Sequence, residues 1–73
     1  MTTSKDAVKA LIDLMNTKTG VTVALRVSAA EGLGYAGGDD ARAALLKVMT
    51  TKTGVSAELK NAAAKALGQA SNG

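Results

Sequence analysis

The chain repeats itself with a period of 34 residues. The string TKTGV at residues 17–21 recurs at residues 51–55. The same shift brings like residues into register over most of the sequence, pairing Ala7 with Ala41, Leu11 with Leu45, Met15 with Met49, Leu25 with Leu59, Leu33 with Leu67 and Gly34 with Gly68. A period in the thirties is typical of helical units that stack into a solenoid. The sequence therefore predicts one domain over residues 1–73, with a first repeat at about 4–38 and a second at about 39–73.

Within each copy the apolar residues recur at helical spacing. Val8, Leu11, Ile12 and Met15 lie three or four residues apart, which places them on one stripe of a helix. Polar or glycine-rich segments separate the apolar stretches and mark turns. The pattern predicts an all-α protein with helices near residues 4–16, 22–36, 40–50 and 56–70.

Short polar residues stand where these helices should begin. Thr3 or Ser4 can cap the first helix, Asp39 or Asp40 the third, and Ser56 the fourth. The apolar stripes also predict which large side chains form the core. This predicted core consists of Leu11, Leu14, Met15, Leu25, Leu33, Leu45, Val48, Met49, Leu59 and Leu67.

The two predicted second helices share a recognisable pattern. Residues 25–34 read LRVSAAEGLG and residues 59–68 read LKNAAAKALG: an aliphatic residue, a basic residue, alanines and then Leu-Gly. This pattern resembles the second helix of HEAT-like repeats, in the short form seen in phycobilisome-lyase-type proteins. The resemblance implies two tandem helix–turn–helix repeats stacked as a short α solenoid. It also implies a scaffold role, or an accessory role toward a lyase-type enzyme.

The composition argues against catalysis. Histidine and cysteine are both absent, which removes the commonest general base, two frequent nucleophiles and the commonest metal ligands. Asp39 and Asp40 are the only close pair of carboxylates, and a helix start accounts for them. We therefore expect a protein that is not an enzyme and holds no cofactor or metal.

The TKTG turns and the basic residues suggest an anion site. Each turn precedes a helix and supplies a lysine, a threonine and a glycine, an arrangement that can bind phosphate. Two basic residues in the following helices are equivalent by the repeat, and the net charge is +3. The candidate contacts are Lys18, Thr19, Gly20, Arg26, Lys52, Thr53, Gly54 and Lys60.

A simpler interpretation is preferred for these residues. The turns also suit plain helix–helix connections, and the charges suit a solvated face. Tyr35 is the single aromatic residue of the chain, so stacked bases would have almost no platform. Weak binding of nucleic acid or phosphate remains the alternative function.

Self-association is favoured because two repeats leave two open ends. Val8 and Ile12 are expected on the outer face of the first helix, where Arg42 and Leu46 are their equivalents in the second copy. The sequence predicts a homo-oligomer, most simply a two-fold dimer in which Val8 and Ile12 meet their counterparts. The primary prediction is therefore a non-catalytic protein–protein interaction or scaffold module.

The first residues carry no targeting signal. Met1 to Lys9 contain no long apolar run, and no stretch of the chain is long enough to cross a bilayer. We expect a cytoplasmic protein without a membrane partner.

Overall fold

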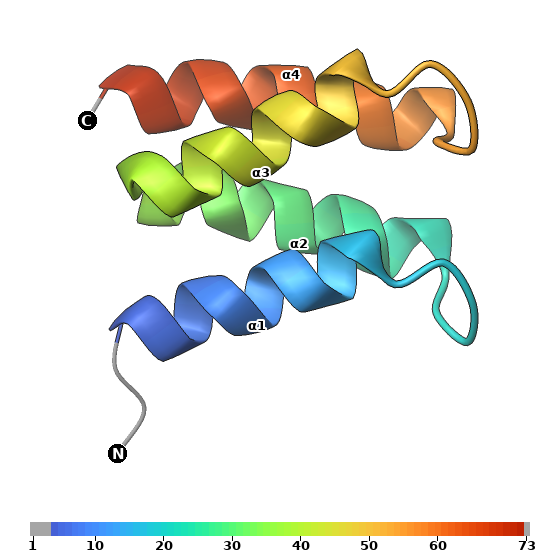
Figure 1. Ribbon diagram of the computed structural model, residues 1–73, viewed down its shortest axis with the longest axis horizontal. Helices are drawn as coiled ribbons and strands as arrows, with labels where there is room; N and C mark the ends of the chain where they lie inside the picture. Colours follow the sequence, from blue (N-terminus) through green and yellow to red (C-terminus); the bar gives the residue numbers. More distant parts are fainter. Residues whose placement is uncertain (1–3, 73) are drawn as a thin grey trace.

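The computed structural model describes residues 4–72 and contains four helices in that range (Figure 1). They are α1 (Ser4–Asn16), α2 (Val23–Ala36), α3 (Gly38–Thr50) and α4 (Ala57–Asn72). No strand occurs among the described residues. The predicted all-α fold is confirmed, and no helix end differs from its expected position by more than two residues. None of the described helices has the length and apolar character needed to cross a membrane.

The helices form two antiparallel hairpins that stack on each other. α1 packs on α2, α3 packs on α4, and the most extensive contact between the hairpins joins α2 to α4. α1 and α4 lie at opposite ends of the stack and do not touch (Figure 1). The Cα atoms span 32 × 27 × 15 Å, so the thinnest dimension holds about two layers of helices. This is the expected short α solenoid.

Hydroxyl side chains begin the two second helices in the same way. The backbone N–H of Leu25 donates to Thr22 Oγ1 at 3.1 Å, and that of Leu59 donates to Ser56 Oγ at 3.2 Å. The predicted cap at Ser56 is confirmed, and Thr22 is the equivalent cap of α2. Ser4 lies within α1 and is not its cap, whereas Thr3 lies outside the described residues.

The predicted cap of α3 is wrong. The helix begins at Gly38 with Gly37 as its N-cap, and no side chain bonds to the free N–H groups there. Both glycines adopt positive φ, 68° and 87°, which lets the chain reverse from α2 into α3 almost without a connecting segment. Asp39 and Asp40 lie in the first turn of α3 instead, where negative charge stabilises the helix dipole.

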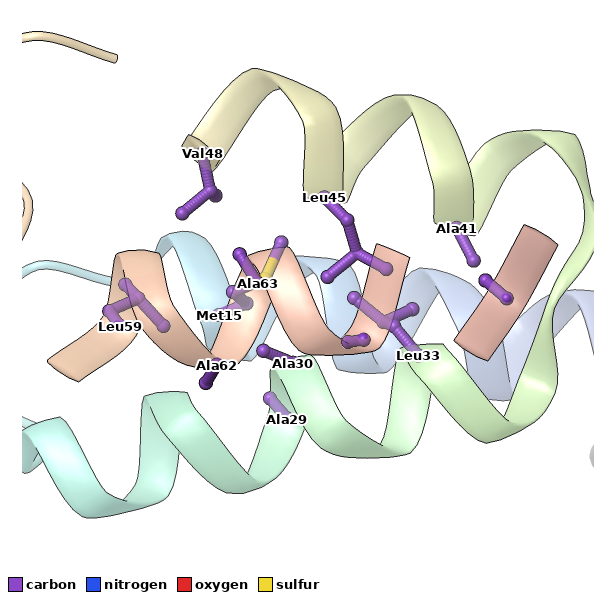
Figure 2. Close-up of a cluster of buried hydrophobic side chains, with 12 residues drawn as sticks. Met15, Ala29, Ala30, Leu33, Ala41, Leu45, Val48, Leu59, Ala62 and Ala63 are labelled. Atoms are coloured by element: carbon purple, nitrogen blue, oxygen red, sulfur yellow. The ribbon is translucent and has the colours of Figure 1, made fainter. Parts of the chain in front are cut away.

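The core lies between the two hairpins (Figure 2). Its largest fully buried side chains are Met15, Leu33, Leu45 and Leu59. Val48 and seven alanines complete the buried set, and the short alanine side chains let the helices approach closely. Buried apolar area of this kind is the main source of the free energy that holds the hairpins together.

Half of the predicted core is fully confirmed. Leu25 is wrong, since 49% of its surface is exposed. Leu11, Leu14, Met49 and Leu67 are only partly buried. The other five predicted residues are buried: Met15, Leu33, Leu45, Val48 and Leu59.

Candidate interaction surface

The junction between the repeats buries a different side of each copy. Equivalent residues, which are 34 positions apart, differ in burial: in four pairs of large apolar residues one member is fully buried and the other is not. The buried members are Met15 and Leu33 in the first copy and Leu45 and Leu59 in the second. Their equivalents are Met49, Leu67, Leu11 and Leu25, in the same order. The two copies thus present opposite sides to one shared junction.

Two outer faces follow from this arrangement. Some second-copy residues are buried where the two repeats meet, and their equivalents in the first copy form what we call the first-repeat face. This face consists of Ala7, Leu11, Leu25, Ser28 and Ala36. Likewise, some first-copy residues pack where the two repeats meet, and their equivalents in the second copy form what we call the second-repeat face. This face consists of Leu46, Met49, Asn61, Ala64, Leu67 and Gly68. All of these residues are exposed or only partly buried.

The most accessible leucines of the described chain lie on these two faces. Leu25 is 49% exposed on the first-repeat face, and Leu46 is 48% exposed on the second-repeat face. Their equivalents, Leu59 and Ile12, are respectively fully buried and packed against the core. Both leucines therefore occupy positions that the repeat covers when a neighbouring repeat is present.

Gly34 sets the distance between α2 and α4. A Cβ atom added at Gly34 would stand 2.9 Å from both Cα and Cβ of Ala66, which is closer than real Cβ atoms approach. The equivalent Gly68 lies in open space, with no atom within 4 Å of such a Cβ. The second-repeat face thus keeps a glycine at the position where the internal junction requires one.

Val8 and Ile12, the predicted self-association residues, are partly buried and packed against the core. Ile12 lines a cavity of about 420 Å³ between α1 and α3, together with Lys9 and Asp40. Val8 borders a second hollow formed by the end of α2 and the start of α3. Both hollows are also lined by residues of the second repeat, Asp40 among them. A dimer through them stays a prediction.

The two TKTG turns have the same local structure. Thr17 Oγ1 donates to the Asp13 carbonyl oxygen at 2.7 Å, and Thr51 Oγ1 donates to that of Lys47 at 2.6 Å. Gly20 and Gly54 both have φ of 80°. The first threonine of each turn therefore bonds backward to the preceding helix. The predicted contact residues Lys18, Thr19, Gly20, Lys52, Thr53 and Gly54 are all exposed.

The two turns lie at the same end of the stack (Figure 1). Lys18 of the first turn and Thr51 of the second line one cavity between the repeats. Lys18, Arg26 and Lys47 line this cavity of about 360 Å³, and no acidic side chain does. Of the eight predicted contact residues, Lys18 and Arg26 line it, whereas the other six do not: Thr19, Gly20, Lys52, Thr53, Gly54 and Lys60. The sequence did not single out Lys47, because its place in the cavity depends on how α3 packs in the tertiary structure, which no repeat spacing reveals.

One cation of this cavity already has a structural partner. Arg26 Nε donates to the carbonyl oxygen of Met15 at 2.8 Å, at the C-terminal end of α1. Positive charge stabilises the exposed carbonyl groups of a helix C-terminus. Arg26 therefore joins the start of α2 to the end of α1, and this contact accounts for a basic residue at its position.

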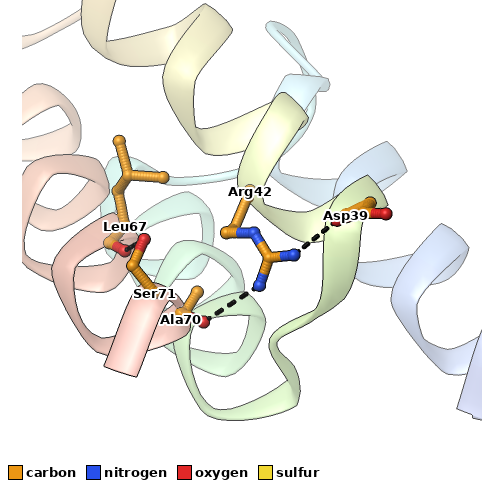
Figure 3. Close-up of polar contacts among 5 residues, drawn as sticks. All are labelled: Asp39, Arg42, Leu67, Ala70 and Ser71. Carbon is orange, nitrogen blue, oxygen red and sulfur yellow. Dashed lines mark hydrogen bonds and ion pairs between the residues drawn. The ribbon is translucent and has the colours of Figure 1, made fainter. Parts of the chain in front are cut away.

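A second arginine ties α3 to α4 (Figure 3). Arg42 Nη1 donates to the carbonyl oxygen of Ala70 at 3.3 Å, while Nη2 forms an ion pair with Asp39. Its equivalent in the first copy is Val8, so the repeat pattern alone gave no signal for this contact.

These groups define the chemistry that the described residues offer. No group of three or more His, Cys, Asp or Glu residues within 4–72 is placed to hold a metal ion. What residues 4–72 do present is two apolar helix faces and one basic cavity. Surfaces of this kind can contact a binding partner.

Comparison with known proteins agrees with this architecture. Residues 25–51 match the family model described as PBS lyase HEAT-like repeat. The matched segment runs from Leu25, near the start of α2, through the Gly37 turn and the whole of α3. No curated protein and no solved structure matches the chain. The match shows a HEAT-like repeat within residues 25–51, and the four-helix stack of residues 4–72 has the form of a short α solenoid.

Proposed function

We propose that this protein is a non-catalytic interaction or scaffold module, which binds protein partners through the outer faces of its helix stack. The HEAT-like architecture supports this role, because stacked helical repeats form extended surfaces for other proteins. An accessory role toward a lyase-type enzyme rests on the family description alone, and no side-chain arrangement points to it.

The observation that carries the proposal is the exposure of Leu25 and Leu46. Each is about half exposed at a position whose equivalent packs within the chain. A large apolar side chain gains free energy when a partner removes it from water, by roughly 25 cal/mol for each Å² covered. The two leucines mark separate ends of the stack, so a scaffold would contact a partner at either end.

A photo-crosslinking amino acid at these positions tests the proposal. Placed at position 25 or 46 in the full chain, in the cells that produce it, the probe should form adducts with protein. The same probe at Thr53, which is exposed in a turn, is the control and should form few. Equal yields at all three positions, or none at 25 and 46, would contradict the assignment of the two faces.

A second candidate function is supported by the basic cavity. Lys18, Arg26 and Lys47 surround one hollow without an opposing carboxylate, an arrangement that attracts phosphate. Replacing Lys18 and Lys47 with Ala should then weaken retention on DNA or RNA more than replacing Lys52 and Lys60, although both pairs remove the same charge. We expect the parent to show no salt-sensitive retention at physiological salt; tight retention lost only in the first double variant would establish this function instead.

A further inference from the structure

We propose that the partner of these faces is a second copy of the same chain, which docks head to tail and repeats the internal junction between molecules. The second-repeat face of one copy would pack on the first-repeat face of the next. This inference rests on the proposed function and names its partner. It differs from a two-fold dimer because the two faces in contact are not the same.

The apolar side chains of the two faces are complementary. Inside the chain, Met15 and Leu33 of the first copy are buried by the second copy. Their equivalents Met49 and Leu67 remain partly exposed on the second-repeat face. The same shift along the solenoid would bring Leu25 of a second copy to the place that Leu59 occupies in the internal junction. The docked copies would therefore bury side chains of the same kind in the same arrangement.

Both faces carry a glycine at the place where the internal junction brings α2 against α4. The internal junction brings Gly34 against Ala66, which permits close contact between α2 and α4. Between copies, Gly68 would meet Gly32 of the second copy, since these two are the equivalents of Gly34 and Ala66. The nearest side chain to the position of a Cβ at Gly32 is that of Leu11, 3.3 Å away, and Leu11 itself belongs to the first-repeat face. The Leu11 side chain would therefore form part of the contact with Gly68 of the docked copy.

The charges at the junction are complementary in both settings. Glu31 of α2 and Lys65 of α4 line the same groove between these helices. They are equivalent to each other in the repeat. A head-to-tail contact would therefore bring Lys65 of one copy to Glu31 of the next, with the two roles exchanged. Opposite charges that face each other favour the correct register over others.

Two variants block one face each. Leu25→Glu places a charge on the first-repeat face, in the first turn of α2, where an acidic residue suits the helix dipole. Gly68→Arg places a long charged side chain on the second-repeat face, in open space within α4. Neither change touches the buried core, so both variants should remain folded, which circular dichroism would verify.

Sedimentation velocity on the full chain then gives distinct outcomes. The parent should show a mass that rises with concentration and does not stop at the dimer, because each added copy leaves a free face at either end. Leu25→Glu and Gly68→Arg should each be monomeric. An equimolar mixture should form a one-to-one dimer and nothing larger. The intact second-repeat face of the Leu25→Glu variant can dock on the intact first-repeat face of the Gly68→Arg variant, and both remaining faces are blocked.

Other results would overturn the proposal. A parent that is monomeric at every concentration would exclude self-stacking. A dimer that only Val8→Glu disrupts would show a two-fold contact instead, as would a mixture that fails to restore association. Crosslinks from position 25 to a different protein, found with a monomeric parent, would leave the interaction function in place and remove only its assignment to a second copy.

Discussion

Leu25 and Leu59 occupy the same position in two copies of one helix, yet Leu25 is 49% exposed and Leu59 has no accessible surface. Both follow an N-cap hydroxyl by three residues and both begin the same alanine-rich pattern. Their difference arises entirely from their neighbours. α4 packs against α2 of the preceding repeat and α3 of its own. α2 packs against α1 of its own repeat, but the described chain contains no preceding repeat whose helix could cover the outer side of α2.

Truncating these two leucines should therefore have unequal effects. Leu59→Ala should lower the free energy of unfolding by about 2–5 kcal/mol, because it leaves a cavity in the core. Leu25→Ala should change it by about 0.5 kcal/mol or less. Urea unfolding of both variants, at a concentration where the parent is monomeric, provides the comparison. If Leu59→Ala fails to fold, Leu59→Met should still cost less than about 1.5 kcal/mol, and equal losses for Leu25 and Leu59 would show that the burial pattern is wrong.

Gly34 and Gly68 offer a second matched pair. Gly34→Ala should destabilise the protein by about 1–3 kcal/mol, because the new methyl group would overlap Ala66 and force α2 away from α4. Gly68→Ala should stabilise α4 by about 0.5–1 kcal/mol, since alanine favours the helix and the site is open. Thermal melts at low concentration would measure both changes. Stabilisation by Gly34→Ala would rule out the close approach.

The two N-cap hydroxyls should contribute equally to stability. Thr22→Ala and Ser56→Ala each remove the acceptor for one free N–H at the start of a helix. Each change should cost about 1 kcal/mol. Thr53→Ala, an exposed turn position without a capping bond, is the control and should be close to neutral. Chemical unfolding would compare the three, and a loss at Thr53 as large as at Ser56 would contradict the assigned caps.

Arg42 should contribute more to the free energy of unfolding than its ion pair with Asp39 alone would give. Asp39→Asn removes the charge of a nearly fully exposed partner and should cost less than about 1 kcal/mol, with the difference shrinking in high salt. Arg42→Met also removes the hydrogen bond to the Ala70 carbonyl oxygen and should cost about 0.5–1.5 kcal/mol more. Unfolding of both variants at low and high salt would separate the two contributions. Identical losses would mean that the Ala70 contact adds nothing.

Much of the local structure could be predicted from the sequence. The repeat, the four helices and the cap at Ser56 depend on spacing and on short-range chemistry: helical periodicity, hydroxyl groups that accept backbone N–H bonds, and turns that interrupt the pattern. The error at Asp39 and Asp40 has a local cause. Gly37 and Gly38 both adopt positive φ, so the helix starts before the aspartates and needs no side-chain cap.

The tertiary structure decided how the two copies differ. Identical spacing places Leu25 and Leu59, or Met15 and Met49, on the same stripe, so periodicity predicts the same burial for both members. Burial, however, depends on which surface lies opposite, and the two repeats share a single junction that covers a different side of each. The basic cavity likewise exists because stacking brings Lys47 beside Lys18 and Arg26. The sequence determined the repeating unit, and the stacking of its two copies determined which of its residues remain open to a partner.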